Sequence, residues 1–133
     1  MTWQELLGFG RDPGVDFAVH TVSHPVLPLL AEEEAVREIA AGLASIQERL
    51  GRCSPVLAAP FGLFDRRTAA QAQAAGVAWT LTLDNRPLRL DASDPLIPRI
   101  SITRRLTSRR LALRLAGVRR PASRWPALPS ATS

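Results

Sequence analysis

The sequence predicts an α/β fold with a mainly parallel sheet, because strand-like runs alternate with helix-like segments along most of its length. Apolar side chains alternate with other residues in the strand-like runs, and they recur at spacings of three and four in the segments between. Of the 133 residues, 46% are hydrophobic and 22% are charged, which is typical of one small globular domain. This composition excludes a fibrous repeat and a chain that is disordered throughout.

The first predicted elements are a short helix and a strand. Residues 2–5 read Thr-Trp-Gln-Glu, the pattern of a capping box, which predicts a helix that starts at this point. After a turn, the apolar side chains of Val15, Phe17 and Val19 alternate with other residues. This alternation predicts a strand that ends at His20.

A long helix, a second strand and a second amphipathic helix follow. Residues 31–50 carry apolar side chains at helical spacing and three glutamates in the first turn, so they predict a helix. Residues 54–59 predict a short buried strand, which ends at Pro60. Asp65 is placed to cap a further helix that runs to Gly76.

Two more strands and a basic helix complete the predicted order. Residues 77–83 predict a strand whose apolar side chains share one face; they are Val77, Trp79, Leu81 and Leu83. Residues 97–102 predict a short strand, and residues 106–116 an arginine-rich helix. Residues 117–133 contain three prolines and little apolar pattern, which predicts a disordered tail.

The charge is distributed unevenly along the chain. Residues 1–98 hold 8 arginines and 12 acidic residues, whereas residues 99–133 hold 9 arginines and no acidic residue. We interpret the basic segment as a solvated helix, and an anionic partner such as lipid headgroups, an acidic glycan or nucleic acid is the alternative. Aromatic residues do not alternate with the arginines, so the signal for nucleic-acid binding is weak.

Several kinds of protein are disfavoured by what the sequence lacks. No apolar run is long enough to span a bilayer, and the N-terminal residues do not resemble a signal peptide. Cys53 is the only cysteine, so it forms neither an internal disulfide nor a cysteine-based metal site. The compartment stays open.

Both histidines lie in one pentapeptide, His-Thr-Val-Ser-His at residues 20–24, directly after the first predicted strand. Parallel α/β folds place their sites at the carboxyl ends of strands, and two imidazoles are half of a four-coordinate zinc shell. Thr21 stands where a helical zinc-protease motif has glutamate, and Pro25 disfavours helical angles at His24, so the pair lies on a turn. Ser23 lacks a base that a carboxylate orients, which disfavours a serine triad. A loop with purely structural histidines is the alternative.

Several segments occur in the order typical of one enzyme family. They are Met-Thr-Trp at 1–3, His-Thr-Val-Ser-His-Pro at 20–25, an acidic helix, Ala-Pro-Phe-Gly at 59–62 followed by Asp65, Ala-Gly at 75–76, and Leu-Ile-Pro-Arg-Ile at 96–100. Through them, residues 1–102 resemble the C-terminal part of a polysaccharide deacetylase domain, the NodB-homology domain of carbohydrate esterases. The resemblance implies a partial, distorted (β/α) barrel with parallel strands that lacks the first strands. A basic helix over 103–116 and the tail over 117–133 would follow it.

The resemblance also implies an activity, the metal-dependent hydrolysis of acetyl groups on an N-acetylated or O-acetylated polysaccharide or oligosaccharide. Such enzymes are hydrolases of carbon–nitrogen bonds other than peptide bonds. In this family two histidines and an aspartate bind a divalent metal, usually zinc, and a second aspartate acts as general base. His20 and His24 match the two histidine ligands.

Further site residues are carried over from the same resemblance. Phe61 matches the residue whose backbone N–H helps to bind the oxyanion, and Pro60 and Gly62 would shape this substrate-binding loop. Arg99 would contact the substrate or orient the base. The alternatives are a plain turn at residues 60–62 and a surface ion pair for Arg99.

The sequence departs from the family pattern in several places. It contains no Asp-Asp pair, so neither the carboxylate ligand nor the general base is present, and the ligand set for zinc is incomplete. No late histidine is left to protonate the leaving amine, and Ala58 and Ala59 stand where family members often have arginine and tyrosine. Asp84 could replace the missing ligand, although Asp84 and Asn85 together are more typical of a turn.

Two hypotheses follow. The first is that the chain is the C-terminal section of a metal-dependent carbohydrate deacetylase, whose upstream coding sequence is expected to contain a strand ending in Asp-Asp-Gly. The second is a catalytically inactive, truncated relative that acts as a glycan-binding or interaction module. Relatives often act outside the cytoplasm, so the resemblance leaves the localisation of this chain open.

Overall fold

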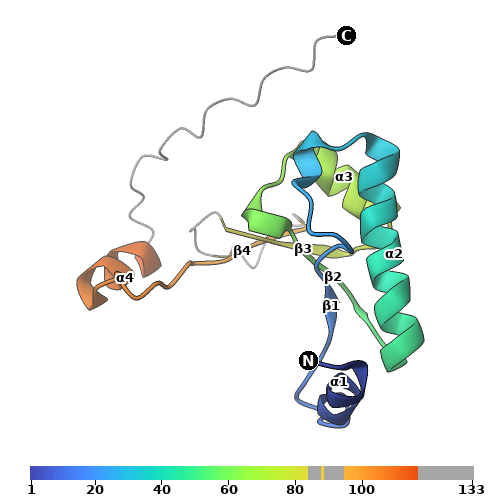
Figure 1. Ribbon diagram of the computed structural model, residues 1–133. Coiled ribbons are helices and arrows are strands. Elements are labelled where there is room, and N and C mark those ends of the chain that lie inside the picture. The colour runs from blue at the N-terminus through green and yellow to red at the C-terminus, as the bar shows by residue number, and fades with distance from the viewer. Residues whose placement is uncertain (84–87, 89–94, 117–133) are drawn as a thin grey trace.

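The computed structural model describes residues 1–83, 88 and 95–116. The described residues form one sheet of four strands, and helices pack beside it (Figure 1). All strands are parallel, and each one pairs with the next along the chain, in the order β1-β2-β3-β4. The strands are β1 (Ala18–Val19), β2 (Ser54–Ala58), β3 (Trp79–Thr82) and β4 (Leu96–Pro98). The predicted class, an α/β fold with a parallel sheet, is confirmed.

Two longer helices connect the first three strands. α2 (Glu32–Leu50) joins β1 to β2, and α3 (Arg66–Ala74) joins β2 to β3. α2 ends at Gly51, whose φ of 76° is the left-handed conformation that favours glycine. α3 begins at Asp65, whose side chain accepts a hydrogen bond from the backbone N–H of Thr68 at 2.7 Å. Both helices start and end close to the residues that the sequence predicts.

The N-terminal helix α1 (Trp3–Phe9) begins with the predicted capping box. The Thr2 hydroxyl accepts a hydrogen bond from the backbone N–H of Glu5 at 3.3 Å, and the Glu5 carboxylate accepts one from the backbone N–H of Thr2 at 2.5 Å. The guanidinium of Arg49 lies 4.7 Å from the centre of the Trp3 ring, in a cation–π contact that joins α1 to the end of α2.

The first strand is shorter than predicted. The sequence predicts a strand over residues 15–20, but only two residues form the β1 ladder, and its register shifts between them. Before β1, the backbone N–H of Ser54 donates to the carbonyl of Phe17 at 2.8 Å, and side-chain contacts add to this bond. The Ser54 hydroxyl donates to the Asp16 carboxylate, and the Arg52 guanidinium donates to the carbonyl of Val15 at 2.5 Å. The alternation in the sequence still corresponds to burial, because Val15, Phe17 and Val19 are more buried than the residues between them.

In the third strand, threonine side chains face the helices, whereas the sequence pattern favours its apolar residues there. Thr80 and Thr82 are buried on the side of Leu57, a core residue, whereas Trp79 is 44% exposed and Leu83 is 39% exposed. Successive side chains of a strand point to opposite faces, so burying the threonines leaves Trp79, Leu81 and Leu83 uncovered by α2 and α3. Val77, which precedes β3, is buried in the core, so the prediction that all four apolar residues share one face is wrong. In parallel sheets both faces are normally covered, and only one face is covered by the described helices.

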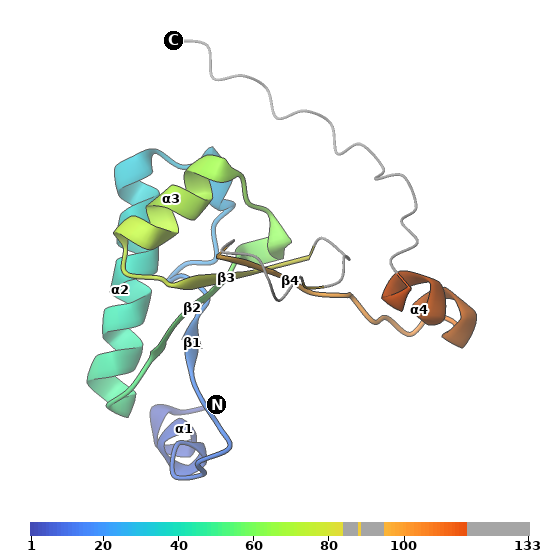
Figure 2. The same cartoon turned by 180° about the vertical axis from the view of Figure 1, so that it is seen from behind.

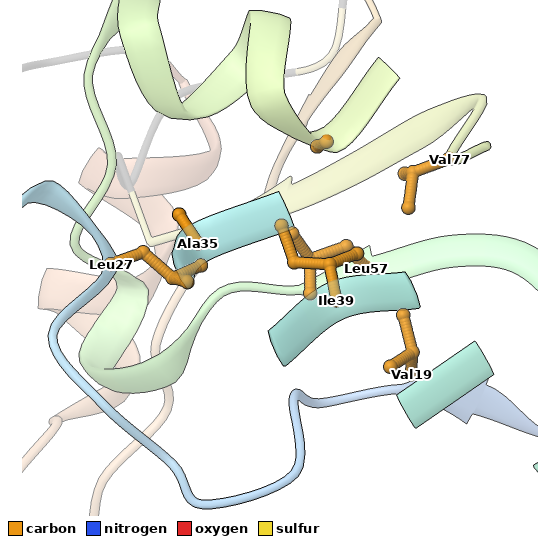
Figure 3. Packing of buried hydrophobic residues seen from close by; sticks show 7 residues of the cluster. Val19, Leu27, Ala35, Ile39, Leu57 and Val77 are labelled. Carbon is orange, nitrogen blue, oxygen red and sulfur yellow. The ribbon is translucent and has the colours of Figure 1, made fainter. Parts of the chain in front are cut away.

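The hydrophobic core lies between α2, α3 and the sheet (Figure 3). It consists of Val19, Leu27, Ala35, Ile39, Leu57, Ala72 and Val77. Gly42 lets α2 approach β1 closely, since a Cβ atom at this position would lie 2.6 Å from Cγ2 of Val19. The segment that follows β1 therefore lies directly against α2.

The chain continues from β4 into a basic helix, α4 (Ser108–Leu115), which begins at the cap residue Thr107. None of its residues is buried, and it lies apart from α2 and α3 in both views (Figures 1 and 2). The predicted basic helix is present, while an anionic partner for it stays a prediction. The tail predicted for 117–133 and the predicted turn at Asp84 and Asn85 fall outside the described residues. Among the described helices, none has the length and apolar character to cross a membrane.

Candidate functional site

Residues 20–24, which we call the histidine loop, follow β1 at the carboxyl end of the sheet. Two of them, Thr21 and His24, have positive φ angles of 65° and 59°. The Thr21 hydroxyl accepts a hydrogen bond from the backbone N–H of His24 at 3.1 Å, which closes the turn. The expectation that the histidines lie on a turn, not within a helix, is confirmed.

The two imidazole rings lie next to each other. Their centroids are 4.8 Å apart, the ring planes are inclined by 73°, and both residues are exposed. Nδ1 of His20 lies 2.5 Å from the carbonyl oxygen of Ala58. A carbonyl oxygen only accepts hydrogen bonds, so Nδ1 carries the proton in this contact and the neutral ring keeps the lone pair on Nε2. Histidines that bind a metal through one ring nitrogen typically donate the N–H of the other ring nitrogen to a carbonyl or carboxylate in this way.

A second loop lies beside the histidine loop. It begins after β2 and contains the short 3-10 helix η2 (Pro60–Gly62), where Phe61 has φ of 57°. The Phe61 ring is 59% exposed, and its centroid lies 4.6 Å from that of His24. Gly62 also has a positive φ, and a Cβ atom there would lie 2.5 Å from Leu83. The structure thus brings together His20, His24, Pro60, Phe61 and Gly62, while the roles assigned to them stay predictions.

Backbone strain is concentrated in these two loops. In the described part of the chain, the only residues other than glycine with positive φ are Thr21, His24 and Phe61. Such conformations cost on the order of 1–3 kcal/mol each and persist where the surrounding structure fixes them. For Thr21 the conformation is the more unusual because its side chain is branched at Cβ. All three strained residues belong to the candidate site.

Arg99 follows β4 at the same end of the sheet. Its backbone N–H donates to the carbonyl of Thr82 at 3.1 Å, and its Nε donates to the same oxygen at 3.3 Å. Part of the guanidinium is therefore engaged with the backbone of the neighbouring strand β3. The roles assigned to Arg99, contact with the substrate or orientation of a base, stay predictions.

A residue that the sequence does not single out, Glu38 of α2, holds the histidine loop. Its Oε2 accepts hydrogen bonds from the backbone N–H groups of Val22 and Ser23 at 3.0 and 2.9 Å, and its Oε1 accepts one from the Ser23 hydroxyl at 2.8 Å. The N–H of Ser23 is the main cause that lowers the pKa of Glu38 from its ordinary value. No spacing rule connects residue 38 to the loop, so only the folded structure shows this contact.

The separation of the two imidazole rings matches that of two ligands on one zinc ion. Two rings bound to one tetrahedral ion at metal–nitrogen distances of about 2.0–2.1 Å would have centroids about 5 Å apart. The separation of 4.8 Å is close to this value. Within residues 1–83, 88 and 95–116, no group of three or more histidine, cysteine or acidic side chains is placed to hold a metal. Asp84, the candidate replacement ligand, lies outside the described residues.

Comparison with known proteins identifies the family. Residues 2–80, more than half of the chain, match the family model for polysaccharide deacetylase. The chain belongs to the polysaccharide deacetylase family. The match contains the histidine loop, Glu38 and the loop around Phe61. No protein of curated function matches the sequence.

Solved structures of deacetylases share the fold of this deacetylase-family chain. The deacetylase PplD of Streptococcus pyogenes, solved in complex with acetate, is 18% identical with a TM-score of 0.74, over 86% of this chain and 50% of PplD. A de-N-acetylase of Aggregatibacter actinomycetemcomitans is 16% identical with a TM-score of 0.74, over 86% of this chain and 53% of that protein. IcaB of Ammonifex degensii is 24% identical with a TM-score of 0.65, over 77% and 48%. The chain spans about half the length of these proteins, which confirms a partial NodB-like barrel.

Proposed function

We propose that this chain is the C-terminal part of a metal-dependent deacetylase that hydrolyses acetyl groups on a polysaccharide or oligosaccharide. The observation that carries the proposal is the pair of adjacent, exposed imidazoles at the carboxyl end of the sheet, with Nδ1 of His20 donating to the carbonyl of Ala58. Family membership and the deacetylase-like fold support it.

Each residue of the site has a distinct task in this proposal. Nε2 of His20 and a ring nitrogen of His24 would bind a divalent ion, most simply zinc. When bound, such an ion polarises the acetyl carbonyl and lowers the pKa of water. The Ala58 carbonyl keeps the His20 ring in the tautomer that binds, and the contact between the rings of His24 and Phe61 limits the rotation of His24.

The loop around Phe61 is suited to receive the substrate. The positive φ of Phe61 directs its backbone differently from a strand or a helix, and its ring is exposed beside His24. We assign to its backbone N–H the stabilisation of the negative oxygen that develops when the acetyl carbonyl is attacked. Pro60 and Gly62 hold this short loop, and Arg99 would contact the sugar or orient a base.

The general base and the third metal ligand are not assigned to the described residues. The described residues contain no cluster of three potential ligands, so a carboxylate from elsewhere is required for the complete ligand set. The same observation favours a second candidate function. In it, the chain is a catalytically inactive relative that binds glycans or another partner through the same loops.

Zinc binding to the intact chain tests the proposal. We expect isothermal titration calorimetry to show zinc binding that His20→Ala or His24→Ala weakens by at least about tenfold, because each removes one of two imidazole ligands. Val22→Ala is the matched control, since its side chain is 61% exposed in the same loop and the backbone N–H that binds Glu38 remains. Equal zinc affinity in parent and histidine variants would exclude the pair as a metal site.

The two candidate functions differ in their products. A deacetylase that contains this chain together with the segment supplying the missing carboxylates releases acetate from N-acetylglucosamine oligomers when zinc is added, and its His20→Ala variant releases none. The binding module retains oligomers without releasing acetate, and its zinc dependence is absent.

A further inference from the structure

We propose that Glu38 is the positioning residue that holds the histidine loop in the conformation in which both imidazoles reach one metal ion. This inference rests on the proposed function, because it assigns Glu38 a task in the same metal site. Glu38 itself is not a ligand in this proposal. Its carboxylate oxygens are occupied by the backbone and by the hydroxyl between the two histidines.

The contacts of Glu38 suit this task better than a single surface hydrogen bond would. Two successive backbone N–H groups, of Val22 and Ser23, converge on Oε2, and the Ser23 hydroxyl donates to Oε1. Convergent N–H groups of this kind bind a negative charge well, and hydrogen bonds to a carboxylate are stronger than those between neutral groups. The lowered pKa of Glu38 shows that the contacts favour its charged form.

The loop needs an external support because its own backbone is strained. Thr21 and His24 both have positive φ, and they flank the two residues that Glu38 binds. The Thr21 hydroxyl and the His24 N–H make a hydrogen bond within the loop, but this bond does not connect the loop to a helix. Glu38 supplies that connection, so its loss would free the segment between the two ligands.

Glu38 is itself held rigidly by the fold. It precedes Ile39, which is fully buried in the core, and it lies about one helical turn before Gly42, where α2 lies close to β1. A Cβ atom on Gly42 would lie 3.4 Å from the carbonyl carbon of Thr21. The carboxylate therefore projects from the part of α2 that lies against the histidine loop. The packing of α2 against the core fixes the position of the Glu38 backbone relative to the histidine loop.

The two histidines differ in what else restrains them. The His20 side chain has its own hydrogen bond to the backbone of β2, at the carbonyl of Ala58. His24 is restrained by the hydrogen bond from its backbone N–H to the Thr21 hydroxyl and by the contacts of its ring with Phe61 and His20. Without Glu38, we expect the relative position of the two rings to vary, and chiefly that of His24.

The test compares Glu38→Ala with Glu38→Gln by zinc titration and by NMR of the histidine rings. We expect Glu38→Ala to weaken zinc binding by about tenfold or more, as observed when residues supporting metal ligands are removed. Glu38→Gln should bind zinc nearly as the parent does. Its amide oxygen can accept both N–H groups and its NH₂ group can donate to the Ser23 hydroxyl, so the conservative replacement rescues the site. Glu48→Ala, an exposed carboxylate on the same helix, is the control.

The outcomes separate this inference from the proposed function. If His20→Ala leaves zinc binding unchanged, the metal site itself is wrong. If His20→Ala abolishes binding while Glu38→Ala binds as the parent does, the metal site stands and the role of Glu38 is refuted. Equal losses in Glu38→Ala and Glu38→Gln would also refute it, since the hydrogen-bond geometry would then be irrelevant.

A folding defect is monitored by circular dichroism. Should Glu38→Ala fail to fold, Ser23→Ala removes only the contact with Oε1 and leaves both backbone N–H bonds in place. This variant is expected to bind zinc more weakly than the parent and to shift the His24 ring resonances more than those of His20. Unchanged affinity and unchanged resonances in Ser23→Ala would count against the inference.

Discussion

Replacing Gly42 by alanine tests whether the close approach of α2 to β1 determines both stability and the position of the histidine loop. The added Cβ atom would lie 2.6 Å from Cγ2 of Val19, a separation that real Cβ atoms essentially never show. Val19 is only 1% exposed and belongs to the core, so its side chain has little space into which to move. Either α2 or β1 must therefore shift.

Two opposing terms set the magnitude. Overpacking of a well-packed core costs about 1–3 kcal/mol. Replacing glycine by alanine within a helix gains about 0.5–1 kcal/mol, because alanine loses less backbone freedom on folding. The expected net effect of Gly42→Ala is thus a loss of up to about 2.5 kcal/mol in the free energy of unfolding.

Gly8→Ala is the matched control for this experiment. Gly8 lies in α1, and a Cβ atom there would meet nothing within 4 Å. The same chemical change should therefore leave stability unchanged or raise it by up to about 1 kcal/mol. Urea unfolding followed by circular dichroism measures both variants under identical conditions.

The Gly42 variant should also bind zinc more weakly. A Cβ atom on Gly42 would lie 3.4 Å from the carbonyl group of Thr21, so relief of the clash with Val19 moves the backbone on both sides of His20. Equal stability of Gly42→Ala and Gly8→Ala would refute the reasoning, because it would mean that α2 and β1 are not in the tight contact that the structure shows.

Three further predictions follow from named contacts. Glu38 and Asp16 both have a lowered pKa, Glu38 chiefly through the N–H of Ser23 and Asp16 chiefly through the Ser54 hydroxyl. The stability that they contribute is therefore present above the carboxyl pKa of the unfolded chain, about 4. This stability is lost as the pH falls through the lower pKa values that the two carboxyl groups have in the folded chain. In unfolding measurements at decreasing pH, Glu38→Gln should therefore lose less stability than the parent. In urea unfolding, Gly62→Ala should destabilise the chain more than Gly51→Ala does. Both positions have positive φ, but only at Gly62 would a Cβ atom also clash, at 2.5 Å from Leu83. Equal effects of the two substitutions would contradict this. Asp65→Ala removes the cap of α3 and should cost about 1 kcal/mol in the same assay, whereas Asp65→Asn should retain most of it.

Much of the fold and of the site could be predicted from local patterns. The capping box at Thr2 and the cap at Asp65 depend on residues three positions apart, so a short stretch of sequence contains the whole interaction. The histidine pair could be placed on a turn because Pro25 restricts the residue before it. Its position at the carboxyl end of the sheet followed from the alternation of strands and helices.

The remaining features depend on contacts between distant segments. Glu38 is separated from Ser23 by 15 positions, and nothing in the intervening sequence specifies that the two meet. The burial of Thr80 instead of Trp79 was not predictable from alternation, which shows that a strand has two faces but not which of them the helices will cover. Likewise, the side-chain contacts that support the chain before β1 involve Ser54, the first residue of β2, and Arg52, which precedes β2.

The hydrogen bond between His20 and the carbonyl of Ala58 bears on how this part of the protein can change during evolution. The acceptor is a main-chain atom, so any residue at position 58 that keeps the β2 backbone in place supplies the same oxygen. Substitutions of the side chain at the end of β2 therefore leave the orientation of the His20 ring unchanged. Alanine at position 58 supplies the same carbonyl oxygen as a larger residue would, so its small side chain leaves the tautomer of His20 intact.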